Sequence, residues 1–161
     1  RMRMRTDCAG NKERYYYDGL NRVLVREKLA GSSTWRTKRV YAVLPGAPIR
    51  QYLGEQEYTV WSGSTPTGGT IRHYHFDLQG NLACALDSTG YVIDRYLGRT
   101  AYGEAVGANS VGPGGLGLTG KFYDATAGAY WFGARWYDPV LARWLEPEPT
   151  GIDGPNLHWF V

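Results

Sequence analysis

Two stretches of the chain share one frame, YYYDGLNRVLV at residues 15–25 and YHFDLQGNLACAL at residues 74–86. In each, an aromatic residue, any residue and a second aromatic residue precede an aspartate, and an apolar run begins after a Gly or Asn three residues further on. Aromatic and β-branched residues favour strands, whereas Asp, Asn and Gly favour the reversals between strands. The frame therefore predicts β-hairpins, and its recurrence is typical of architectures in which similar units stack.

Short apolar or aromatic runs alternate with turn residues through most of the chain, which contains 22 Gly, 13 Tyr and 6 Trp. No window keeps a helical period long enough to compete, so the pattern predicts an all-β fold. The predicted strand segments are RVYAVL (39–44), IRQYL (49–53), EYTVW (57–61), IRHYHF (71–76), LACAL (82–86) and YVIDRYL (91–97), and the predicted interruptions are PGAP (45–48), GSTPTGG (63–69), DLQGN (77–81) and DSTG (87–90).

The charge balance gives little indication of a charged partner. The chain carries 18 basic and 15 acidic residues, a net charge of +3 at pH 7, and this small excess does not point to nucleic acid. No run reaches the roughly 18–20 apolar residues that a bilayer-spanning helix needs, so we expect no membrane span. Two cysteines, Cys8 and Cys84, are too few for a disulfide framework and leave the redox compartment open.

A glycine-rich segment, ANSVGPGGLGLTG at residues 108–120, separates the hairpins from a denser aromatic region. We expect three parts: β-hairpins over residues 1–107, a flexible connector over 108–120 and an aromatic region over 121–161. Within the last part, AYWFGARWY (129–137) would be largely aromatic on both faces if it formed one extended strand. Such a strand is covered on both sides, as in a plug packed inside a surrounding sheet.

The run GLTGKFYDATAGAYWFGARWYDPVLARWLEPEPTG (117–151) resembles the core-associated motif that ends Rhs and YD-repeat proteins. The stretch from Tyr74 to Glu104 is similar to the family's segment just upstream, and YYYDGLNRV resembles an ordinary YD repeat, so the resemblance runs from about Tyr15 to Val161. It implies a spiralling ribbon of β-hairpins that forms the wall of a hollow shell, with an inward-turning C-terminal plug. In many members of the family, a toxin domain follows and is held inside the shell.

The resemblance and the turn chemistry together assign roles to two sets of residues. An aspartate that follows an aromatic residue can accept hydrogen bonds from backbone N–H groups two residues on and so fix a reversal. The core-motif residues are expected to pack the plug, with arginine side chains lying on aromatic rings. The repeat-turn residues are Asp18, Asp77, Asp124 and Asp138, and the core-motif packing residues are Tyr130, Trp131, Arg135, Trp136, Tyr137 and Arg143.

Members of the family can cleave themselves at an aspartyl-protease-like site near the core motif. Such chemistry needs two carboxylates, one ionised and one protonated, and Glu148 and Asp153 are the candidates here, with Glu146 a lesser one. However, Glu148 stands where the family has aspartate, and the sequence ends at Val161 without the family's cleavage segment. We therefore expect these acids to be solvated loop or turn residues and expect no enzyme activity.

Other patterns are weaker. His73, His75 and Asp77 would share one face of a strand and could bind zinc, but the repeat frame assigns them to ordinary strand and turn positions. Gly115, Gly117 and Gly120 spell a dinucleotide fingerprint without the strand and helix that it requires. We expect no metal and no other cofactor.

Three functions remain, each in a different class. The first is a structural segment of an Rhs-type shell that encloses or presents a C-terminal effector, whose partners are the rest of a larger repeat chain or its cleaved effector. The second is a cell-surface module that binds glycan or protein through exposed aromatic residues. The third is a residual aspartyl-type autoprotease. The family resemblance implies a secreted or cell-surface location.

Overall fold

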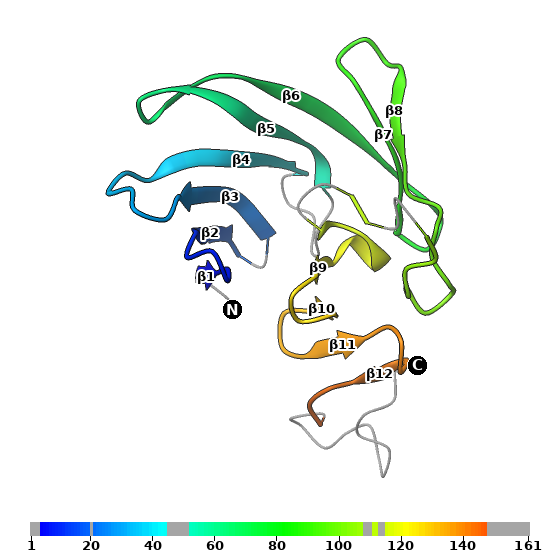
Figure 1. Ribbon diagram of the computed structural model, residues 1–161. Helices are drawn as coiled ribbons and strands as arrows, with labels where there is room; N and C mark the ends of the chain where they lie inside the picture. The colour runs from blue at the N-terminus through cyan, green and yellow to red at the C-terminus, as the bar shows by residue number, and fades with distance from the viewer. Residues whose placement is uncertain (1–3, 20, 45–51, 108–110, 113–114, 148–161) are drawn as a thin grey trace. The chain divides into compact units, whose positions relative to one another are not determined.

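The computed structural model describes residues 4–19, 21–44, 52–107, 111–112 and 115–147, and within these residues the secondary structure is β-strand with no α-helix (Figure 1). The chain divides into two compact units. The first unit comprises residues 1–74 and 85–93, and the second comprises residues 75–84 and 94–161. The prediction of an all-β fold is confirmed.

Eight strands form one sheet in the order in which they occur in the sequence, β1 to β8 (Figure 1). The five ladders from β1 to β6 are all antiparallel. Each strand therefore bonds to its sequence neighbours, as expected for consecutive hairpins. The strands are β1 (Met4–Thr6), β2 (Lys12–Asp18), β3 (Asn21–Lys28), β4 (Arg36–Val43), β5 (Tyr52–Ser62), β6 (Thr65–Phe76), β7 (Leu82–Leu86) and β8 (Val92–Arg95).

A second, four-stranded antiparallel sheet lies within the second unit, in the order β12-β11-β10-β9. Its register aligns Tyr123, Tyr130, Tyr137 and Trp144 in one row across all four strands. This row packs with Leu118 to form the core of the unit, and Tyr137 is completely buried. The strands are β9 (Phe122–Asp124), β10 (Ala129–Trp131), β11 (Trp136–Asp138) and β12 (Arg143–Trp144).

Residues 129–137 do not form one extended strand. The segment folds back on itself as β10 and β11, which are joined by a reversal at Phe132–Arg135 in which the Phe132 N–H donates to the Arg135 carbonyl over 3.0 Å. Gly133 has a φ of +100°, a conformation that glycine adopts without steric cost and that an extended strand does not contain. The reversal brings Tyr130 opposite Tyr137, so that both lie on the buried face instead of on opposite faces.

The predicted break at GSTPTGG is also too long. Strand β5 runs to Ser62 and β6 begins at Thr65, so only two residues form the turn. Two irregularities in the ladder, at Tyr58/Val60 and Val60/Trp61, accommodate the proline and glycines at the start of β6.

The expected connector is described at residues 111–112 and 115–120. There Leu116 and Leu118 are buried, and a short 3₁₀ turn spans Leu118–Gly120. This part of the segment is packed into the second unit. Elsewhere, Cys8 is exposed, Cys84 is half-buried, and both are free thiols.

Candidate functional site

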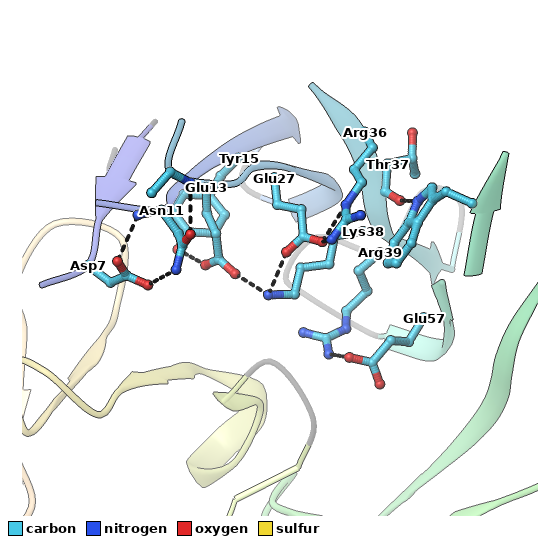
Figure 2. A network of polar contacts seen from close by, with 12 residues as sticks. Asp7, Asn11, Glu13, Tyr15, Glu27, Arg36, Thr37, Lys38, Arg39 and Glu57 are labelled. Carbon is cyan, nitrogen blue, oxygen red and sulfur yellow. Dashed lines mark hydrogen bonds and ion pairs between the residues drawn. The ribbon is translucent and has the colours of Figure 1, made fainter. Parts of the chain in front are cut away.

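Charged side chains gather on one face of the large sheet, between β2 and β6, and Figure 2 shows most of them. We call this set the ion-pair face. Eight residues in two groups make it up: Glu13, Glu27, Arg36 and Lys38 in the first group, and Arg39, Glu55, Glu57 and Arg72 in the second. Each group holds two acids and two bases, so each is formally neutral.

In the first group, Lys38 lies between two carboxylates. Its Nζ is 2.7 Å from Glu13 Oε1 and 3.3 Å from Glu27 Oε2, while Arg36 lies 2.9 Å from the other oxygen of Glu27 (Figure 2). Burial alone would raise the pKa of Glu13, but the hydrogen bond and charge of Lys38 lower it below its usual value. Burial likewise opposes the charge on Lys38, and the two glutamates more than offset this and raise its pKa.

In the second group, Arg39 bridges Glu55 and Glu57. Its Nε is 2.9 Å from Glu55, and an Nη contacts Glu57. Arg72 approaches the same two carboxylates at 3.2 and 3.0 Å. The Glu55 side chain is completely buried, and this burial raises its pKa even though Arg39 and Arg72 oppose the shift. A buried charge of this kind is tolerated only because it is paired.

Tyrosines complete this face of the sheet. Tyr15, Tyr41 and Tyr74 are all more than nine-tenths buried, and burial raises the pKa of each phenol. The Tyr15 hydroxyl donates to Glu13, and the Arg22 guanidinium stacks 4.2 Å above the Tyr15 ring. The face therefore consists of paired charges framed by aromatic rings.

A pocket of about 310 Å³ opens beside the first group and is lined mainly by charged and amide side chains. The carboxylates that line it are engaged: Glu13 and Glu27 hold Lys38, and Asp7 holds Asn11. Across the residues that the structure describes, no cluster of three His, Cys, Asp or Glu side chains could hold a metal ion. His73 and His75 are exposed, and the Asp77 carboxylate accepts bonds from its own turn.

The four predicted turn aspartates all lie at strand ends. Asp77 Oδ1 accepts from the backbone N–H groups of Gln79 and Asn81. Burial alone would raise the pKa of Asp77, but the hydrogen bond from the Asn81 side chain and these two backbone bonds lower it below its usual value. Asp124 and Asp138 each accept two backbone N–H bonds at 2.8–3.2 Å from the turns that follow them. Asp18 is exposed and pairs with Asn21 across the β2–β3 reversal.

The predicted packing residues divide between the two faces of the small sheet. Tyr130 and Tyr137 lie in the buried row, and burial raises the pKa of each phenol to about 12. Their hydroxyls donate to the Gly103 and Tyr102 carbonyls. The remaining aromatic residues, Trp131 and Trp136, pack against one another on the other face, with ring centroids 5.0 Å apart, and both are half-buried.

Two arginines of the core motif have different surroundings. The Arg135 guanidinium lies 4.1 Å from the centroid of the Trp144 ring, which is a stacking contact. Arg143 is exposed and pairs with Asp138 across β11 and β12. Of the candidate acids for self-cleavage, Glu148 and Asp153 lie outside the described residues. Glu146 accepts a 2.8 Å hydrogen bond from the Trp136 backbone N–H and so joins the end of β12 to β11.

Sequence reasoning missed the ion-pair face. One signal was available. Glu55 and Glu57 are two residues apart, as are Arg36 and Lys38, and residues at this spacing lie on the same face of a strand. A bulge in the β3–β4 ladder between Val25 and Arg26 then brings Arg39 to the same face, which strict alternation would place opposite.

No family model matches the chain. Among curated proteins, the chain is 34% identical over 151 residues to toxin subunit YenC1 of Yersinia entomophaga. The alignment covers 91% of this chain and 15% of that protein. It is 28% identical to toxin subunit YenC2 of the same organism, over 98% of this chain and 19% of that protein. The chain thus spans less than a fifth of the length of these relatives.

Solved structures agree in fold. A crystal structure of TcdB2-TccC3 without its hypervariable C-terminal region superposes with a TM-score of 0.66 at 23% identity, over 95% of this chain and 7% of that one. A Photorhabdus luminescens Tc holotoxin pore superposes with a TM-score of 0.65 at 23% identity, over the same shares of both chains. The chain therefore has the all-β fold of Tc toxin shell proteins, and its homologues are Tc toxin subunits, which are Rhs/YD-repeat proteins.

Proposed function

We propose that this chain forms the last hairpins and the plug of an Rhs-type shell in a Tc-toxin-like subunit, and that the shell encloses or presents a C-terminal effector. The observation that carries this proposal is the similarity to YenC1, which extends over 91% of the chain. Its partners would be the rest of the repeat chain and the effector, and its location would be secreted.

The geometry supports a wall rather than a reaction centre. Eight strands follow one another without a crossover, as a continuous ribbon of hairpins requires. The eight charged side chains of the ion-pair face form ion pairs with one another, which makes this face of the sheet rigid. None of the eight is left over to act as a general acid or base. The aromatic row of the small sheet is buried and packs a core.

Intact mass and C-terminal sequencing of the protein recovered from its native source test this proposal. We expect additional hairpins before this region, and an unrelated domain that either continues the chain or co-purifies as a second polypeptide. A native protein that comprises these 161 residues alone, with no second polypeptide, would contradict it.

Trp131 and Trp136 support a second candidate, a surface module that binds glycan, because they form a half-buried ring pair. Saturable binding on a glycan array that disappears in Trp131→Ala and Trp136→Ala would favour this candidate over the shell.

We expect no self-cleavage, because a glutamate replaces the family's aspartate at residue 148. A time course of the purified full chain, analysed by mass spectrometry, tests this expectation. Formation of a defined new terminus that is lost in both Glu148→Ala and Asp153→Ala would overturn it and establish an autoprotease.

A further inference from the structure

Among the residues that the structure describes, three turns that begin with an aspartate have the same backbone bonds. In each, an Asp is followed by two residues, a Gly and a last residue. The Asp N–H donates to the carbonyl of the last residue, and the Gly N–H donates to the Asp carbonyl, at 2.9–3.2 Å. The Gly has a φ between +78° and +89°. The turns are Asp7–Asn11, Asp77–Asn81 and Asp87–Tyr91.

The two turns that end in asparagine make a further pair of bonds. Each Asn Nδ2 donates to the second carboxylate oxygen of the turn aspartate, at 2.9 Å in Asn11 and 2.8 Å in Asn81. This bond fixes the amide, so that its oxygen points away from the turn. Asn11 Oδ1 then accepts from the Ala30 N–H at 3.0 Å, and Asn81 Oδ1 accepts from the Thr119 N–H at 2.8 Å.

The acceptor contacts reach far along the chain. Ala30 is 19 residues from Asn11, and Thr119 is 38 residues from Asn81. The third turn ends in Tyr91, whose side chain has no amide. The Asp87 carboxylate of this turn accepts hydrogen bonds from Thr89 and Tyr91 only within the turn. The same reversal therefore occurs with and without an asparagine that contacts a distant segment.

Asn81 holds an unusual segment. Thr119 adopts φ +45° and ψ +37°, the left-handed conformation, which costs a side chain other than glycine about 1 kcal/mol. Two residues before Thr119, the Gly117 carbonyl accepts from the Leu82 N–H at 3.2 Å. This bond and the bond from the Thr119 N–H to Asn81 together join the turn to this segment. Leu118, between them, belongs to the core that also contains Tyr130 and Tyr137.

We propose that the last asparagine of an Asp-x-x-Gly-Asn turn is a clip that fixes a distant backbone segment to the turn, and that Asn81 sets the position at which the aromatic region begins. The residue must both donate to the aspartate and accept from the distant N–H. An aspartate would repel the turn aspartate, and a serine is too short to reach both groups. The inference does not depend on the proposed shell function.

Amide hydrogen exchange of the full chain tests the clip, with protection read at Thr119 and Ala30. Loss of one such bond corresponds to exchange about fivefold to thirtyfold faster. We expect Asn81→Ala to accelerate exchange at Thr119 but not at Ala30, and Asn11→Ala to do the reverse. Tyr91→Ala is the matched control and should change neither site. Unchanged exchange at Thr119 in Asn81→Ala would overturn the proposal.

The swap Asp77→Asn with Asn81→Asp separates the clip from general destabilisation. The exchanged pair can form the same bonds, because the amide at residue 77 then donates to the carboxylate at residue 81, whose other oxygen faces the Thr119 N–H. We expect the swap to restore protection at Thr119, whereas Asn81→Asp alone should lose it through carboxylate repulsion. If Asn81→Ala unfolds the chain, the swap decides: restored protection supports the clip, and lost protection contradicts it.

Discussion

The two sheets stabilise their buried faces in opposite ways. The first unit aligns charged and phenolic side chains across β2–β6, so that Glu55 is completely buried beside Arg39 and Arg72. The small sheet of the second unit aligns aromatic rings, with Tyr137 touching Trp144 and Phe132 at centroid distances of 5.6 and 5.8 Å. Aromatic packing stabilises through the large apolar area of the buried rings, whereas a buried charge requires its partner to be in place. The large sheet is therefore stabilised by pairing between charged side chains, and the small sheet by the packing of buried aromatic rings.

The largest effect should follow removal of a ring from the small sheet. Tyr137→Ala deletes a side chain with no exposed surface, and we expect it to lower the free energy of unfolding by about 4 kcal/mol. Trp136→Ala is the matched control, because the neighbouring Trp136 lies on the other face and is half-buried. Urea denaturation measures both variants. An equal loss in the two would contradict the assignment of Tyr137 to the core.

A smaller effect should follow neutralisation of one charge in the large sheet. Glu55→Gln keeps the shape of the side chain but leaves Arg39 and Arg72 with one carboxylate, so we expect a loss of about 2 kcal/mol. Glu57→Gln removes an equal charge from a side chain that is 22% exposed and should cost less. The comparison between the sheets fails if Glu55→Gln is as stable in denaturant as the unchanged chain.

The all-β fold and some of the turns can be predicted from the sequence, whereas the Gly133 reversal and the ion-pair face cannot. Strand-forming residues and the Asp77 reversal follow local rules, so the all-β fold and several turns were predicted from short segments. The reversal at Gly133 was missed because aromatic residues on both sides of it continue a strand pattern, and one glycine can occur within a strand. The ion-pair face was missed because it depends on pairing between strands and on a bulge, which no single segment specifies.

The turns of the small sheet allow a test in both directions. Gly128 and Ala142 occupy equivalent places, each just before the residue that pairs with a turn aspartate, and both have positive φ, +65° and +51°. Ala142→Gly should stabilise the chain by about 1 kcal/mol, because glycine adopts this conformation without strain. Gly128→Ala should destabilise it similarly, since a Cβ there meets nothing within 4 Å and only the backbone cost remains. Thermal unfolding measures both. Shifts of the same sign would contradict the equivalence.

The smallest expected effect is a loss of stability at acid pH. Hydrogen bonds hold the pKa of Asp77 below its usual value in the folded state, so its contribution to stability is present above the unfolded pKa and is lost as the pH falls through the folded pKa. We expect the free energy of unfolding to fall below about pH 4, with Asp77 contributing less than about 1 kcal/mol because it is exposed. Asp77→Asn should show a shallower loss than the unchanged chain in urea melts between pH 5 and pH 2. An identical slope would exclude this role of Asp77.

The order of the large sheet has a consequence for how the chain acquires its structure. Because β1 to β8 pair in the sequence in which they occur, each new strand needs only the strand before it as a template. Contacts between near neighbours close short loops, which lowers the entropic barrier to folding. Such a ribbon can be built progressively from its first strand, or taken apart from one end, without any strand having to pass between two others.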